Sequence, residues 1–187
     1  MKLLRALALL SLSLVSLWAH SEERLVDNQS AITFITKQMN VPLEGRFRQF
    51  AAHIDFDPRN PEASKVEIEV DVASATLGMP DTDAELVKPE WFDAKRFPKA
   101  VFKATTVKRT GPGKFEAVGK LEIKSVSRDV IVPINVSQTG TTTVATGTFS
   151  LKRIDFKIGD GDWKDTSIVA DPVQVSFKLN FTGVGPL

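Results

Sequence analysis

The sequence contains no cysteine, no tyrosine and only two histidines among its 187 residues. Without cysteine the chain can form no disulfide, and it cannot use a thiolate as a nucleophile or metal ligand. A serine hydrolase would need a histidine base, but no GxSxG nucleophile elbow is present. His53 lies in a predicted strand between Ala52 and Ile54, where we expect a structural role. The sequence therefore predicts no catalytic residue and no enzyme.

The sequence also lacks an excess of either charge and a complete metal-ligand pattern. The 24 basic and 23 acidic residues nearly balance and form no basic patch of the kind that binds nucleic acid. Asp160, Asp162 and Asp165 lie in a GDGDWKD segment that resembles part of a calcium loop, but the remaining ligand spacing and terminal glutamate of an EF-hand are missing. We expect this segment to be an ordinary polar turn. The sequence thus predicts no metal site, no cofactor and no nucleic-acid partner.

The first 21 residues have the composition of a signal peptide. Lys2 and Arg5 precede an apolar, serine-rich run over 7–17, and small residues at 19 and 21 suit a cleavage site. The run is shorter than the roughly 20 residues that span a bilayer. No cysteine follows it, which excludes attachment as a bacterial lipoprotein. We expect this segment to be removed and the protein to reside in a bacterial periplasm.

Residues 22–187 have the size of one domain with a substantial core. The chain has 12 phenylalanines and no tyrosine. Phenylalanine brings apolar area without the hydroxyl group that a buried tyrosine must pair. The composition therefore predicts a dry interior, which suits either an ordinary core or an apolar pocket.

Alternation of apolar and polar residues predicts about eight strands. The clearest case is 64–73, where one face is buried and the other is solvated. Segment 43–56 does not keep a single period of two, and we expect a long strand bent at Gly45. Turn signals recur at the spacing of an all-β sandwich or barrel. The predicted strands cover 30–39, 43–56, 64–73, 101–108, 114–124, 130–136, 143–151 and 173–181.

One short helix interrupts the strands. Thr82 and Glu85 have the spacing of a capping box, so the helix should begin after Thr82, and Pro89 should end it. The connector that follows, Lys88–Phe102, holds four aromatic residues among charged ones. Because each buried ring contributes about 1.5–3 kcal/mol, this connector should fold onto an apolar surface. It either plugs one end of a core or forms a lid at the mouth of an apolar cavity.

Side chains on the inward face of each predicted strand are the candidates for lining such a cavity. We assign them from the alternation of each strand. The predicted ligand-binding residues are Phe34, Phe47, Val70, Phe102, Phe115, Leu121, Phe149 and Phe177 on strands, and Trp91 and Phe92 in the connector.

Four segments of the chain occur in an order that identifies a family. EWFDAKRFPKAVF at 90–102 is similar to FFDA..(Y/F)P..F, and GKLEIKSVSRDV at 119–130 is similar to G.LTI.G.(T/S)..V. RIDFKIG at 153–159 is similar to R.DFGI, and GRFRQFAAHIDFDP at 45–58 also fits. In this order, and over nearly the whole predicted domain, these motifs resemble the YceI-like family.

The resemblance implies an all-β fold: an eight-stranded antiparallel lipocalin-like barrel, with a short helical connector between strands three and four. It implies an exported bacterial protein that encloses a long apolar molecule, such as a polyisoprenoid, a polyprenyl quinone or a fatty amide. Ser125 and Lys157 depart from the pattern, because the family often has glycine at both positions.

The leading hypothesis is therefore a periplasmic binding or carrier protein whose partner is an isoprenoid or another long-chain lipid. The alternative is an all-β structural or stress-related interaction module without a ligand, in which the phenylalanines only pack against one another. An enzyme that acts on lipids or quinones through His53 is a third reading. A transient contact with inner-membrane proteins or lipids, and a homodimer, are further partners left open by the sequence.

Overall fold

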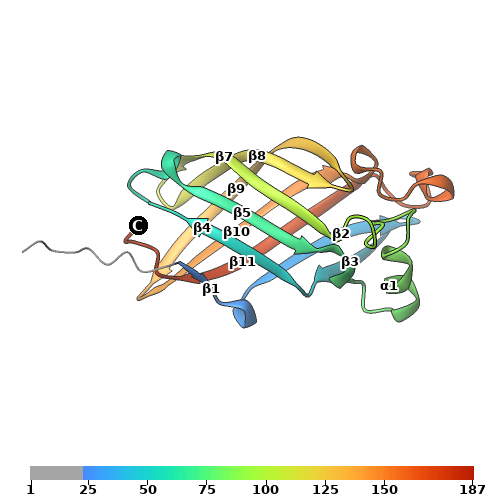
Figure 1. Ribbon diagram of the computed structural model, residues 1–187, viewed down its shortest axis with the longest axis horizontal. Helices are drawn as coiled ribbons and strands as arrows, with labels where there is room; N and C mark the ends of the chain where they lie inside the picture. Colours follow the sequence, from blue (N-terminus) through green and yellow to red (C-terminus); the bar gives the residue numbers. More distant parts are fainter. Residues whose placement is uncertain (1–22) are drawn as a thin grey trace, which may run out of the picture.

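The structure, a computed structural model, describes residues 23–187, in which eleven strands form one sheet that curls into an elongated barrel (Figure 1). All paired strands in this part of the chain are antiparallel. The predicted signal peptide lies outside the described residues. Within 23–187, no helix combines the length and apolar character needed to cross a membrane.

The strands are β1 (Arg24–Leu25), β2 (Ala31–Gln38), β3 (Val41–Phe47), β4 (Phe50–Asp55), β5 (Lys65–Asp71), β6 (Ala75–Thr76), β7 (Lys99–Gly111), β8 (Lys114–Ile123), β9 (Val126–Thr139), β10 (Thr142–Lys152) and β11 (Pro172–Thr182). The helical elements are α1 (Pro80–Leu86) and the short 3-10 turns η1 (Asp27–Gln29), η2 (Pro61–Ala63), η3 (Val72–Ser74), η4 (Arg153–Phe156) and η5 (Gly161–Lys164).

The strand order explains how the barrel closes. The sheet runs β4-β5-β7-β8-β9-β10-β11-β2-β3, with the two-residue strands β6 and β1 added beside β3 and β11. β3 and β4 stand at opposite ends of this order but follow each other in the chain. Counted as one bent strand, they make the described sheet a barrel of eight long strands. The predicted fold is confirmed, although two short strands were not foreseen.

The bend in this strand lies at Arg48 and Gln49, and the expectation that Gly45 makes it was wrong. Inward positions are odd-numbered in β3 and even-numbered in β4, so the bend shifts the alternation by one residue. The backbone N–H of Arg48 donates to Ser74 O, and that of Gln49 donates to Ser74 Oγ. The turn after β5 thus satisfies the groups that leave the ladder at the bend.

Helix α1 begins at Pro80, three residues earlier than the capping box predicted. Pro80 takes the first helical position, where its fixed φ suits the helix and its missing N–H costs nothing. Thr82 therefore lies inside the helix and does not cap it. The carboxylate of Asp83 instead accepts from the backbone N–H of Leu77 and from the Thr76 hydroxyl, which ties the helix to the preceding strand. These bonds lower the pKa of Asp83, the Thr76 bond most strongly.

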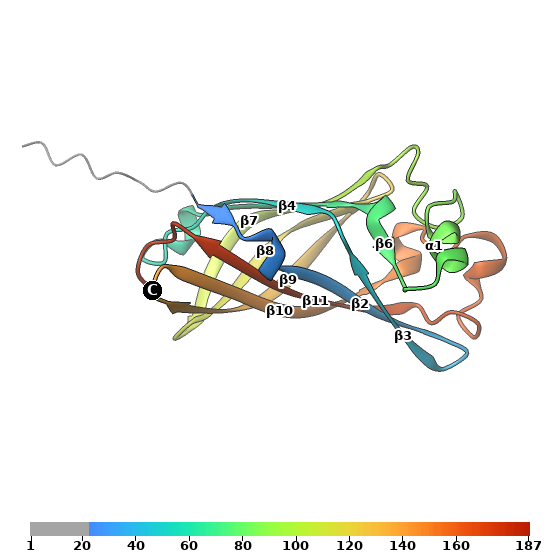
Figure 2. The same ribbon diagram turned by 90° about the horizontal axis from the view of Figure 1, so that it is seen from below.

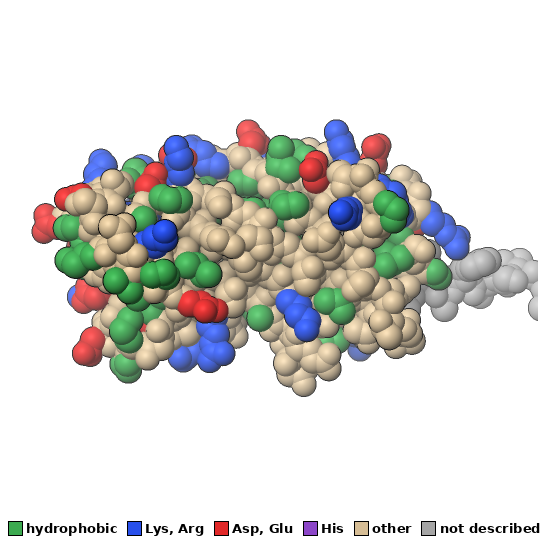
Figure 3. All heavy atoms as spheres, turned by 180° about the vertical axis from the view of Figure 1, so that it is seen from behind, with side chains coloured by type: hydrophobic (Ala, Val, Ile, Leu, Met, Phe, Trp, Pro, Cys, Tyr) green, Lys and Arg blue, Asp and Glu red, His purple; other side chains and the backbone are tan. Residues whose placement is uncertain are grey.

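The two ends of the barrel differ. Helix α1 and the loops around η4 and η5 lie at one end, while β1 and the C-terminus lie at the other (Figures 1 and 2). We call the first the α1 end. On the face shown in Figure 3, basic and acidic side chains are interspersed over the outer surface.

The two positions where glycine was expected have left-handed backbone. Ser125 has φ 60° and Lys157 has φ 57°. Side chains with a Cβ rarely adopt this conformation, which costs about 1–2 kcal/mol per residue. Ser125 and Lys124, with φ 49°, form the turn between β8 and β9, and Lys157 ends η4. The family glycines therefore have a physical explanation, and this chain tolerates strain at both places.

We expect Lys157→Gly to raise the free energy of unfolding by up to about 1 kcal/mol, because the relief of strain exceeds the entropy that glycine adds to the unfolded chain. Lys152→Gly is the matched control, since Lys152 is also exposed but has φ −100°. That variant should lose stability. Urea denaturation measures both changes, and equal losses in the two variants would contradict the strain argument.

Candidate functional site

The barrel encloses a cavity of about 520 Å³. Ligand cavities in proteins commonly have about 300–1,000 Å³, so this one has room for a small molecule or the folded tail of a long one. Its wall consists of inward side chains from the long strands, with α1 and the connector at the α1 end. Most of these side chains are aliphatic or aromatic, because each strand alternates apolar and polar residues.

All ten sequence-predicted residues lie along this wall. They are Phe34, Phe47, Val70, Trp91, Phe92, Phe102, Phe115, Leu121, Phe149 and Phe177. The structure thus brings them together around one space, and their role in ligand binding stays a prediction. The wall also contains side chains outside this selection, among them Val66 on the same face of β5 as Val70, and Ile54 and Phe56 in and just after β4.

Two glycines make room for aromatic rings in the wall. Gly45 stands directly opposite Phe34 on the neighbouring strand, and Gly147 stands opposite Phe177. A Cβ atom at either glycine would overlap the ring across from it. Each ring therefore occupies the space that a Cβ atom of the opposite residue would take.

The connector between α1 and β7 contributes aromatic contacts to the α1 end. The ring of Phe92 is buried with its centroid 6.1 Å from that of Phe47. The ring of Trp91 lies 5.4 Å from that of Trp163 in η5. The connector therefore packs both on the barrel and on the η5 loop, as either of its two predicted roles requires.

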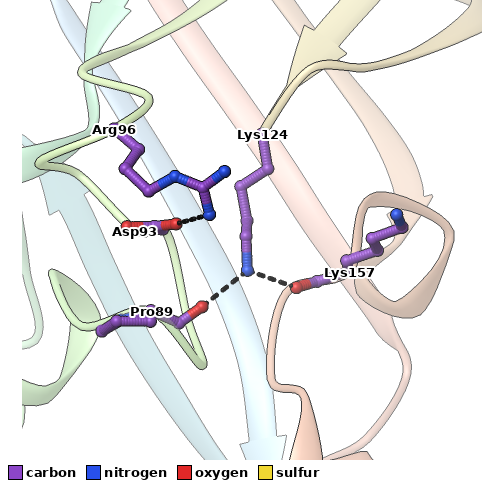
Figure 4. Close-up of polar contacts among 5 residues, drawn as sticks. All are labelled: Pro89, Asp93, Arg96, Lys124 and Lys157. Carbon is purple, nitrogen blue, oxygen red and sulfur yellow. Dashed lines mark hydrogen bonds and ion pairs between the residues drawn. The ribbon is translucent and has the colours of Figure 1, made fainter.

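Lys124 fastens this connector to the η4 loop (Figure 4). Its ammonium group donates to Pro89 O and to Lys157 O, both at 2.8 Å. Burial lowers the pKa of Lys124, and the carboxylates of Asp160, Asp93 and Glu90 partly oppose that shift. A single side chain on the β8–β9 turn thereby joins two segments that close the α1 end.

Arg153 is a buried cation at the α1 end, and its guanidinium group makes a full set of hydrogen bonds. Its side chain is among the most completely buried, and each of its five N–H groups is directed to a backbone carbonyl. The acceptors are the carbonyl oxygens of Ala170, Ile158, Gly159, Trp163 and Val169. Burial lowers the pKa of Arg153, and Asp171 opposes the shift.

Arg153 and Asp155 would share one face if the strand continued through them, but the structure does not place them so. Both lie in the 3-10 turn η4, where Arg153 is buried and Asp155 is exposed. The chain leaves the sheet at Arg153 because its guanidinium group collects carbonyls from the loop that follows. The sequence pattern did not indicate this role of Arg153.

Polar side chains enter the cavity wall mainly at the α1 end. Thr36 and Gln38 belong to the last part of β2, and Asp81, Thr82 and Glu85 belong to α1. Sequence reasoning did not select any of them for the site. The signal was a helix start at Pro80, because Asp81 and Glu85 then lie four residues apart on one face of the helix.

Two polar groups considered in the sequence do not belong to this cavity. His53 is exposed on β4, on the face opposite Ile54, and does not line the wall. The carboxylate of Asp165 accepts from the backbone N–H and hydroxyl of Ser167, at 2.8 and 2.7 Å, which lowers its pKa. The GDGDWKD segment is thus part of a hydrogen-bonded turn.

The sequence is similar to proteins of one family. The YceI-like domain matches residues 24–181. A UPF0312 protein of Azotobacter vinelandii is 30% identical over 135 residues, which cover 70% of this chain and 70% of that protein.

Solved structures have the same fold. Burkholderia cenocepacia BcnA is 39% identical with a TM-score of 0.81, and the match covers 84% of this chain and 99% of that chain. A polyisoprenoid binding domain from Saccharophagus degradans, implicated in plant cell wall breakdown, is 14% identical with a TM-score of 0.72. That match covers 87% of this chain and 99% of the other, and at this identity it shows the fold alone.

We expect Gly45→Ala to destabilise the protein by about 1–3 kcal/mol, because the added methyl group overlaps the Phe34 ring. The double variant with Phe34→Leu should recover most of that loss. Gly185→Ala is the control, since a Cβ there meets no atom within 4 Å. Chemical denaturation of the wild type, Gly45→Ala, Phe34→Leu and the double variant gives the coupling energy, and strictly additive losses would contradict this account of Gly45.

Proposed function

The chain belongs to the YceI-like family, and from this premise we propose that it binds one long apolar molecule inside its barrel. The ligand classes that fit are a polyisoprenoid, a polyprenyl quinone and a fatty amide. We propose further that the protein carries or sequesters this ligand in the periplasm. The contact with the inner membrane and the homodimer remain predictions from the sequence.

The observation that carries the proposal is the apolar cavity of about 520 Å³. A cavity of this volume costs on the order of 10 kcal/mol if its wall has no partner atoms. That is comparable to the whole stability of a typical domain. A module whose phenylalanines only pack against one another would fill the space with side chains. An apolar occupant explains the cavity better, because each buried methylene contributes about 0.8 kcal/mol.

The similarity to a polyisoprenoid binding domain supports an isoprenoid as the occupant. The wall supports it physically, since a long branched hydrocarbon needs little polar contact to bind tightly. An enzyme is less well supported, because His53 lies on the outer face of β4 and away from the cavity.

The ligand test begins with protein purified under native conditions. Native mass spectrometry and solvent extraction should release a long apolar molecule, and the extracted protein should bind such molecules again. Ala145→Leu narrows the cavity from the wall, and we expect it to weaken rebinding at least tenfold. Ala51→Leu, on an exposed position of β4, should leave binding unchanged. Protein that is reproducibly without lipid and binds none would refute the proposal.

Export is tested by fractionating the native bacterium. The signal-peptide pattern at 1–21 supports a periplasmic protein whose first residue lies between 20 and 22. N-terminal sequencing of the periplasmic fraction should find that end. Uncleaved protein in the cytoplasm would contradict the proposed location.

A further inference from the structure

The polar side chains of the cavity wall are unevenly distributed along the barrel. Asp81, Thr82 and Glu85 approach it from α1, and Thr36 and Gln38 face it from β2, all at the α1 end. Away from that end, the polar wall residue is Thr143, whose hydroxyl already accepts a hydrogen bond from Gln138. An amphiphile therefore finds partners for its polar head only at the α1 end.

Two buried polar atoms without a hydrogen-bond partner lie on wall residues of this same end. Within residues 23–187, the Thr36 hydroxyl and the Trp91 indole N–H are such atoms. Leaving a buried donor or acceptor unpaired costs about 1–3 kcal/mol. A ligand head that accepts from the indole and pairs with the hydroxyl would recover this cost after a small shift of either side chain.

The α1 end offers a ligand no cation from the wall. Arg153 is the only lysine or arginine among the described wall residues, and all five of its N–H groups bond to backbone carbonyls. A phosphate or carboxylate would have to compete with those carbonyls for the guanidinium group. The Arg153 guanidinium group therefore has no free N–H group to donate to a ligand.

The charges that remain in the wall are both negative. Asp81 is exposed at the rim, and Glu85 is half-buried one helical turn further on. Lys88 pairs with Glu85 on the outside, but it does not line the cavity, and exposed pairs of this kind are weak. An anionic head entering here meets like charge without a compensating cation in the wall.

From these observations, and on the basis of the proposed function, we infer how the cavity selects and orients its ligand. The α1 end is the head-group site. It takes an uncharged or cationic hydrogen-bonding head and rejects a phosphate or carboxylate on the same tail. The hydrocarbon tail runs toward the end that carries β1 and the C-terminus (Figure 2).

Three ligands that share the same tail and differ only in the head group test this selectivity. Farnesol, farnesylamine and farnesyl phosphate compete with the neutral fluorophore N-phenyl-1-naphthylamine for the purified, lipid-extracted protein. We expect the alcohol and the amine to displace it, and the phosphate to bind at least tenfold more weakly than the alcohol. If the phosphate binds as well as the alcohol, the inference is overturned while the proposed function stands. If no ligand binds, the proposed function itself fails.

Substitutions in α1 test whether its carboxylates cause the rejection of the phosphate. Asp81→Asn, and then Asp81→Asn with Glu85→Gln, should reduce the difference between alcohol and phosphate to less than threefold. Circular dichroism checks that the variants are folded, and each variant is judged by its own ratio of farnesol affinity to farnesyl phosphate affinity. Asp55→Asn, on an exposed position of β4 away from the cavity, is the control and should keep the full difference. An unchanged difference in the α1 variants would overturn the assignment.

Discussion

The barrel depends on one bend in the chain. β3 and β4 belong to opposite edges of the sheet, yet only Arg48 and Gln49 separate them. The covalent chain joins the edges where no hydrogen-bonded ladder does, and the shift in alternation lets both halves send apolar side chains inward. Without the bend the sheet would keep two open edges, which tend to pair with other chains. The closed wall and the cavity both follow from it.

The α1 end is held by cations that bond to backbone. Arg153 collects five carbonyls from one loop, and Lys124 joins that loop to the connector. Burying a charge is costly, and charge-assisted hydrogen bonds offset the cost when every donor is used. The same arrangement has a functional consequence. Groups that order these loops are no longer free to attract an anion.

Strand faces could be predicted from the sequence because alternation is local. Each predicted wall residue follows from the parity of its own strand or from its place in the connector, and all ten lie along the cavity. The bend could not be placed, because Ser74, which satisfies its backbone, is distant in sequence. The role of Arg153 was missed for a similar reason, since its acceptors come from a loop without regular pattern. The start of α1 was misjudged because Pro80 at the first position outweighed the capping box at Thr82.

A wall of phenylalanine and aliphatic side chains can select a ligand by the size of its hydrocarbon tail, but it does not distinguish one head group from another. A tail of fifteen carbons can contribute on the order of 10 kcal/mol at about 0.8 kcal/mol per methylene, and that contribution is the same for any head group. Attraction of the head is then unnecessary for affinity, whereas rejection of a wrong head is decisive for specificity. Two carboxylates at the mouth, with no available cation in the wall, supply such a rejection with very few residues. The apolar barrel therefore provides the affinity for the tail, and the few polar residues at its rim provide the specificity for the head group.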